Sequence, residues 1–68
     1  MPRWWAICAE IARRCINETT GRVEIPKSEA KLADDVLDWL AKKGQGQPAT
    51  SEMREAVRYV CAALRPLQ

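Results

Sequence analysis

Apolar residues recur every three or four positions along three stretches of this chain, at about residues 3–18, 28–43 and 51–65. That spacing places them on one side of an α-helix, which turns by about 100° per residue. Glycine and proline lie between the stretches, in segments 21–26 and 44–48, and Pro66 follows the third. Because both residues interrupt helices, the sequence predicts an all-α domain of three helices joined by short connectors.

The length of 68 residues allows one small domain. Hydrophobic residues make up 47% of the chain and charged residues 29%, as in globular proteins and unlike disordered ones. We therefore expect a single helical domain over residues 1–68, with a flexible linker at 44–50. The formal net charge of +2 is too small to draw the whole chain onto nucleic acid or a membrane.

The ends of the predicted helices carry their own signals. Ser28 is a good cap for the second helix, and Thr50 or Ser51 for the third. Gly21 and Gly44 can adopt the positive φ that often ends a helix. Segment 23–25 alternates apolar and polar residues before Pro26, which favours an extended connector. No second strand candidate exists in the chain, so this connector could be a strand only if a partner strand comes from another subunit.

The apolar sides of the first two helices are wider than a small bundle requires. Each covers an arc of about 200°, whereas a surface helix needs an apolar stripe of only about 100°. We expect a second copy or another protein to cover the excess. The prediction is a homodimer with Trp4 or Trp5, together with Ile7 and Ile11, at or near the interface.

The composition excludes most catalytic and metal chemistry. The chain has no histidine, no glycine-rich phosphate loop and no nucleophile beside a base, so we expect no enzymatic activity, cofactor or metal. Cys8 and Cys15 would lie about 10.5 Å apart on one helix, too far for a disulfide. We interpret them and Cys61 as small buried residues, with a redox or metal role as the alternative. Three unpaired cysteines and no apolar run of membrane-spanning length predict a cytoplasmic protein.

The tryptophans are candidate contact residues. Trp4 and Trp5 lie about 100° apart on the first helix, so both cannot enter one narrow seam. Tryptophan is enriched at interaction hot spots, and we expect at least one of the two to contact a partner. The alternative places both of them, with Trp39, in the core.

Two charged helix faces are further candidates. Arg54, Arg58 and Arg65 share one side of the third helix. This side suggests a helix-turn-helix that enters a DNA groove, but the linker is longer than usual, and Glu52 and Glu55 would face phosphates. We therefore favour a protein contact for these arginines.

The second helix carries an acidic stripe formed by Asp34, Asp35 and Asp38. Its simplest interpretation is a solvated face balanced by lysines. The alternative is a contact with a basic surface on a partner.

Together these features predict a small non-enzymatic intracellular protein-interaction module whose partner is a protein. Its most concrete form is a bacterial or phage-encoded inhibitor or adaptor that binds a larger complex, such as host defence or regulatory machinery. The alternative function is a small DNA-binding regulator that uses the Arg54, Arg58 and Arg65 face. We expect no membrane partner.

Overall fold

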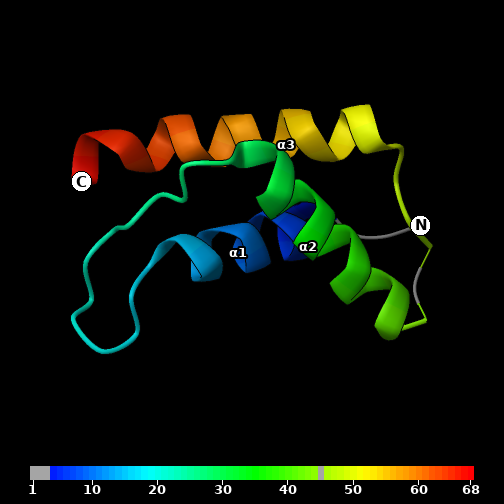
Figure 1. The fold of residues 1–68 in the computed structure, drawn as a ribbon, viewed down its shortest axis with the longest axis horizontal. Coiled ribbons are helices and arrows are strands. Elements are labelled where there is room, and N and C mark those ends of the chain that lie inside the picture. The colour runs from blue at the N-terminus through cyan, green and yellow to red at the C-terminus, as the bar shows by residue number, and fades with distance from the viewer. Residues whose placement is uncertain (1–3, 45) are drawn as a thin grey trace.

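The computed structural model describes residues 4–44 and 46–68, and within them the chain forms three α-helices and no strand. These are α1 (Trp4–Cys15), α2 (Glu29–Lys42) and α3 (Thr50–Leu64), and a single 3-10 turn, η1 (Arg65–Leu67), follows α3. Helices α1 and α3 lie side by side and run in the same direction, while α2 crosses them obliquely (Figure 1). The prediction of a small three-helix domain is confirmed. Arg3, the predicted start of the first helix, lies outside the described residues.

Helix α2 begins and ends as the sequence predicts. The backbone N–H of Lys31 donates to Ser28 Oγ at 3.1 Å, which satisfies one of the free amides of the first turn. Gly44 follows the helix with a φ of 73°. These features confirm Ser28 and Gly44 as the boundary signals of this helix.

The cap of α3 differs from the prediction. Ala49, rather than Thr50 or Ser51, is the cap, and its carbonyl accepts from the N–H of Met53 at 3.0 Å. An alanine offers no side-chain acceptor. Instead Glu52 Oε1 reaches back to accept from the N–H of Ala49 at 3.3 Å, as the glutamate of a capping box does.

Helix α1 ends at Cys15, three residues before the predicted end. The side chain of Asn17 causes this, because its Oδ1 accepts from the N–H groups of Thr19 and Thr20 at 2.8 and 3.2 Å. These contacts close a tight turn that competes with the helix. Gly21, with a φ of 73°, completes the reversal of the chain.

The reversal brings segment 23–25 back against the end of α1. Ile16 and Val23 form an isolated antiparallel bridge, and the N–H of Glu24 donates to the carbonyl of Cys15 at 2.7 Å. The segment forms no strand and is an extended connector, as predicted, but it makes one bridge that the sequence did not indicate. The partner comes from the same chain, because the end of α1 unwinds to provide it.

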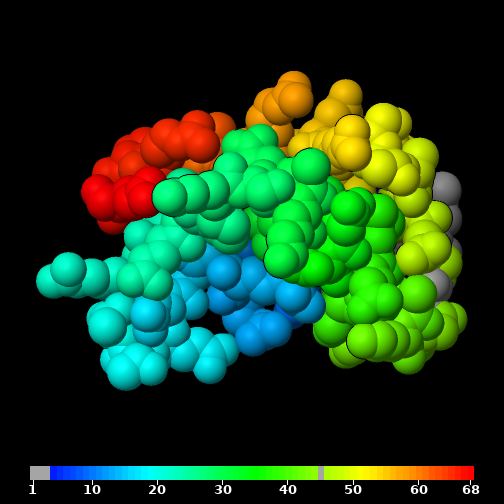
Figure 2. Space-filling model, in the orientation of Figure 1, coloured from blue at the N-terminus to red at the C-terminus, as the bar shows by residue number. Residues whose placement is uncertain are grey.

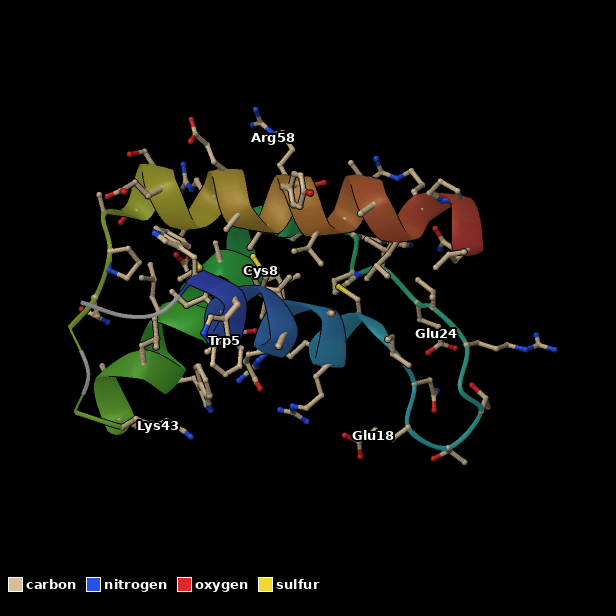
Figure 3. All side chains as sticks on the ribbon, turned by 180° about the vertical axis from the view of Figure 1, so that it is seen from behind. Trp5, Cys8, Glu18, Glu24, Lys43 and Arg58 are labelled. Carbon is tan, nitrogen blue, oxygen red and sulfur yellow. The ribbon has the colours of Figure 1, made fainter. Side chains whose placement is uncertain are left out.

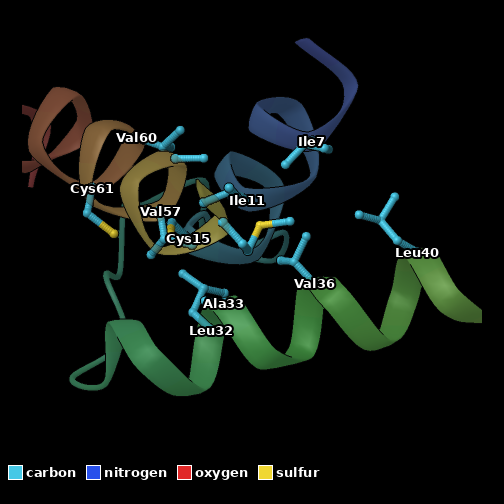
Figure 4. Packing of buried hydrophobic residues seen from close by; sticks show 12 residues of the cluster. Ile7, Ile11, Cys15, Leu32, Ala33, Val36, Leu40, Val57, Val60 and Cys61 are labelled. Carbon is cyan, nitrogen blue, oxygen red and sulfur yellow. The ribbon is translucent and has the colours of Figure 1, made fainter. Parts of the chain in front are cut away.

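All three helices contribute to one core. Figure 4 shows Val36 and Leu40 of α2 pointing toward Ile7 and Ile11 of α1. Ile7 and Ile11 are fully buried within the chain, so these two side chains are not available to contact a second copy directly. The buried hydrophobic residues are Ile7, Ile11, Cys15, Leu32, Ala33, Val36, Leu40, Met53, Ala56, Val57, Val60 and Cys61.

Glu10 is a charged residue at the edge of this core. The sequence places it on the polar side of the first helix, but it is only 7% exposed. Arg13 donates to both of its carboxylate oxygens, at 2.9 and 2.8 Å, and Arg14 Nε donates to Oε2 at 2.7 Å. The hydrogen bonds from Arg13 hold the pKa of Glu10 below its ordinary value, although burial opposes them. The two arginines lie one helical turn after Glu10 and cover it from solvent.

Candidate partner-binding surface

Most of the aromatic side chains lie on the surface. The chain has three tryptophans, one tyrosine and no phenylalanine. Trp4 is 42% exposed, Trp5 69% and Tyr59 73%, while Trp39 is half-buried. Large rings in water are unfavourable unless something covers them. We call the surface formed by Trp4, Trp5, Cys8 and Tyr59 the aromatic face.

Helix geometry explains the exposure of Trp5, whereas Trp4 is exposed because it lies at the start of the helix. The core side of α1 is set by Ile7, Ile11 and Cys15, which follow one another at four-residue spacing. Trp4, seven residues before Ile11, lies on that same side, but in the first turn of the helix, where it lines a groove beside α3. Trp5 lies about 100° further round and faces away from the core. Figure 3, the view from behind, shows Trp5 on the exposed side of α1 and Cys8 between α1 and α3.

The exposed side of α1 is apolar along its length. Trp5 and Ala9 are exposed, Ala12 is half-buried, and Ile16 is 37% exposed. Trp5, Ala9 and Ala12 recur every three or four positions, so they form a second apolar stripe next to the core-facing one, and Ile16 follows directly after the helix. The wide apolar arc predicted from the sequence therefore divides into a buried stripe and an open one.

A groove of about 480 Å³ runs between α1 and α3. The two helices run in the same direction, so the first turn of α1 lies beside the N-terminal half of α3. Tyr59 was not among the contact residues predicted from the sequence. The groove is lined by Trp4, Cys8, Glu52, Glu55, Ala56 and Tyr59.

A larger cavity of about 800 Å³ lies at the other end of the molecule. Figure 2 shows this end, where the segment between α1 and α2 lies beside the C-terminal end of α3. Its lining combines apolar and polar residues, with Arg22 and Glu24 as charged groups of opposite sign. The lining residues are Ile16, Gly21, Arg22, Val23, Glu24, Leu64, Leu67 and Gln68.

The three predicted contact arginines differ in the ion pairs that they form within the chain. Arg65 Nη2 lies 3.6 Å from Glu29 Oε2 at the start of α2, so its charge is partly balanced within the chain. Arg54 and Arg58 are exposed and form no ion pair with any residue in 4–44 or 46–68. Figure 3 shows Arg58 pointing away from the body of the molecule.

The arginines and the aromatic face lie on different sides of α3. Arg54, Arg58 and Arg65 recur at nearly the same helical angle, and Arg65 contacts α2. Tyr59 lines the groove beside α1 instead. The structure therefore does not join the predicted contact residues Trp4 and Trp5 to the arginines in a single patch.

The acidic stripe of α2 is exposed, as predicted. Asp38 Oδ2 lies 3.0 Å from Lys42 Nζ, one helical turn later. Asp35 and Asp38 also line a cavity of about 260 Å³ in which Arg14 and Lys42 supply positive charge. Much of the acidic charge of this stripe is thus balanced locally.

The three cysteines are free thiols. Cys15 and Cys61 are fully buried, as predicted, whereas Cys8 is half-buried in the groove. Burial raises the pKa of the Cys15 thiol to about 11, and the neighbouring Cys61 thiol raises it further. Burial also raises the pKa of Cys61. Across the described residues, no group of three or more acidic or cysteine side chains is placed to hold a metal ion.

Comparisons of the chain with protein-family models, with curated proteins and with solved structures find no match. None of the helices in 4–44 and 46–68 is long and apolar enough to cross a membrane. The feature that departs most from an ordinary solvated helical domain is the aromatic face with the groove beside it. That surface is the candidate site.

Proposed function

We propose that this protein is a small binding module that docks on a larger protein through its aromatic face. The observation that supports this function is the exposure of Trp4, Trp5 and Tyr59 together on a domain of this size. Tryptophan and tyrosine are the residues most often found at the energetic centre of protein interfaces. Their exposure lowers solubility, and a partner that covers them gains binding energy from the apolar surface that is buried.

The core does not depend on these rings, which also favours a binding role. It is closed by aliphatic, methionine and cysteine side chains from all three helices. Within the described residues, every buried side-chain nitrogen or oxygen has a hydrogen-bond partner. A domain that folds without Trp5 and Tyr59 leaves them free to contact a partner.

The proposed role is non-enzymatic and intracellular. Its most concrete form is a bacterial or phage-encoded inhibitor or adaptor, which acts by occupying a surface of a larger cytoplasmic complex. Three free thiols suit a reducing compartment. A second copy of the chain is the competing occupant of the aromatic face, and the exposed Arg54 and Arg58 are the competing surface.

The test is affinity capture with tagged protein from a bacterial lysate, using matched surface variants. Trp5→Ser with Tyr59→Ser removes two exposed rings from the aromatic face. Arg54→Ser with Arg58→Ser, the control, removes two exposed side chains from the other side of α3. We expect the wild type and the control to capture the same heavier protein and the aromatic variant to lose it, with all three folded by circular dichroism. Loss in the arginine variant alone would overturn the assignment.

A further inference from the structure

The groove between α1 and α3 has an unusual balance of charge. Its charged lining residues are Glu52 and Glu55, and no basic residue lines it among the residues described. Three other cavities each combine both signs. The largest has Arg22 with Glu24, and the two beside α2 set lysine or arginine against aspartate.

The two glutamates differ in the contacts that their carboxylates already make. Glu52 Oε1 accepts from the N–H of Ala49, which leaves Oε2 for another donor. Glu55 is exposed and forms no ion pair with any described residue. The groove therefore presents carboxylate oxygens next to Trp4 and Tyr59, over a floor formed by Cys8 and Ala56.

One aromatic ring of the chain, that of Trp39, is already paired with a cation. Lys43 Nζ lies 4.8 Å from the centre of the Trp39 ring, a cation–π contact. In the described part of the chain, no cation lies over the ring of Trp4 or Tyr59. Trp4 and Tyr59 therefore lie beside carboxylates that would attract a cation, but no described residue places a cation over their rings.

We propose that this groove binds an arginine side chain presented by the partner protein. The inference rests on the proposed function and names the chemistry that the aromatic face recognises. A guanidinium is planar, so it stacks on an aromatic ring while its edge donates hydrogen bonds to carboxylates. A lysine ammonium lacks the flat face and the paired donors. Aromatic rings, two glutamates and an apolar floor thus suit arginine better than lysine.

The test is a titration followed by heteronuclear NMR. The probe is an acetylated and amidated pentapeptide with arginine between two pairs of alanines, and its control carries citrulline, which keeps the shape and removes the charge. The full chain carries Arg3→Gln, because Arg3 directly precedes Trp4 and could compete with the probe. We expect the arginine peptide to shift the Trp4 indole N–H and the amides of Cys8 and Ala56. The citrulline peptide should bind at least about tenfold more weakly. Equal shifts with both peptides, or shifts confined to other residues, would overturn the proposal.

Charge-neutral variants test the role of the two carboxylates. Glu52→Gln with Glu55→Gln should weaken binding of the arginine peptide about fivefold, because two exposed charge contacts are lost. The glutamine at position 52 keeps an oxygen that can accept from the N–H of Ala49, so α3 should still begin at the same residue. Asp34→Asn with Asp35→Asn is the control, since it removes the same charge from α2. An equal loss in both double variants would show a general charge effect and contradict the groove.

The two proposals can fail separately. If the arginine peptide does not bind but lysate capture still depends on Trp5 and Tyr59, the arginine assignment is wrong and the proposed function stands. If capture does not depend on those rings either, the proposed function is wrong as well.

Discussion

Replacing Glu10 with glutamine should destabilise the protein measurably. Glu10 is 7% exposed and accepts three hydrogen bonds, at 2.9, 2.8 and 2.7 Å, from Arg13 and Arg14. Glutamine keeps one acceptor oxygen and turns an amide donor toward arginine donors, so at least one of these contacts is lost and the charge attraction disappears.

The size of this loss in stability depends on how exposed the two arginines are. A buried hydrogen bond to a charged group contributes about 1.5–3 kcal/mol, whereas an exposed ion pair contributes less than about 1 kcal/mol. The side chains of Arg13 and Arg14 are 56% and 28% exposed, so water replaces part of the hydrogen bonding that they lose. We therefore expect Glu10→Gln to lower the free energy of unfolding by about 1.5 kcal/mol. For a domain of this size that corresponds to a melting temperature roughly 10 °C lower.

Urea denaturation followed by circular dichroism at 222 nm measures this loss. Glu18→Gln is the matched control, because Glu18 also binds Arg13, at 3.1 Å, but its side chain is 75% exposed. Its effect should be close to zero. The pKa of folded Glu10 is lowered, so its stabilisation is present above the ordinary carboxyl pKa and is lost as the pH falls through the lowered value. The difference between wild type and Glu10→Gln should shrink in that acidic range. A loss below about 0.3 kcal/mol at neutral pH, or one equal to that of Glu18→Gln, would refute the account.

Three further predictions follow from the core, the thiols and the arginines. Leu40→Ala, which empties a buried site, should cost about 3 kcal/mol in urea denaturation, whereas Leu67→Ala, at an exposed site, should change stability by less than about 0.5 kcal/mol. Iodoacetamide at pH 8 should label Cys8 alone in the folded protein and all three thiols in urea, because Cys15 and Cys61 are fully buried and the pKa of Cys15 is raised to about 11; mass spectrometry counts the adducts. Random duplex DNA should not bind at about 50 mM salt, because Glu29 partly balances Arg65 and the net charge is only +2; fluorescence anisotropy that rises with protein concentration would contradict this.

The helices could be predicted from the sequence because their signals are local. The three-to-four-residue spacing of apolar side chains, the cap at Ser28 and the break at Gly44 all act within a few residues. The end of α1 could not be predicted in the same way. It depends on the pairing of Ile16 with Val23, which requires the chain to reverse first. The local signal for that reversal is Asn17, whose side chain holds the turn.

The site could be predicted only in part. The 100° offset between Trp4 and Trp5 indicates that one of them must face outward, and both are exposed in the structure. A single helix pattern cannot show that α1 and α3 run in the same direction. That packing alone places Tyr59 and Glu55 beside Trp4. The ion pairs of Glu10 could have been predicted, since arginines follow it by three and four residues.

Photo-crosslinking in bacterial cells tests the central claim most directly, because it records what touches the aromatic face of the folded protein. Benzoylphenylalanine replaces Trp5 in one variant and Arg58 in another, so that the probe lies either on the aromatic face or on the side of α3 that carries the arginines. We predict an adduct with one heavier protein from position 5 and none from position 58. An adduct of twice the 7.7 kDa chain mass from position 5 would instead place a second copy on this face. Adducts from position 58 alone would contradict the account.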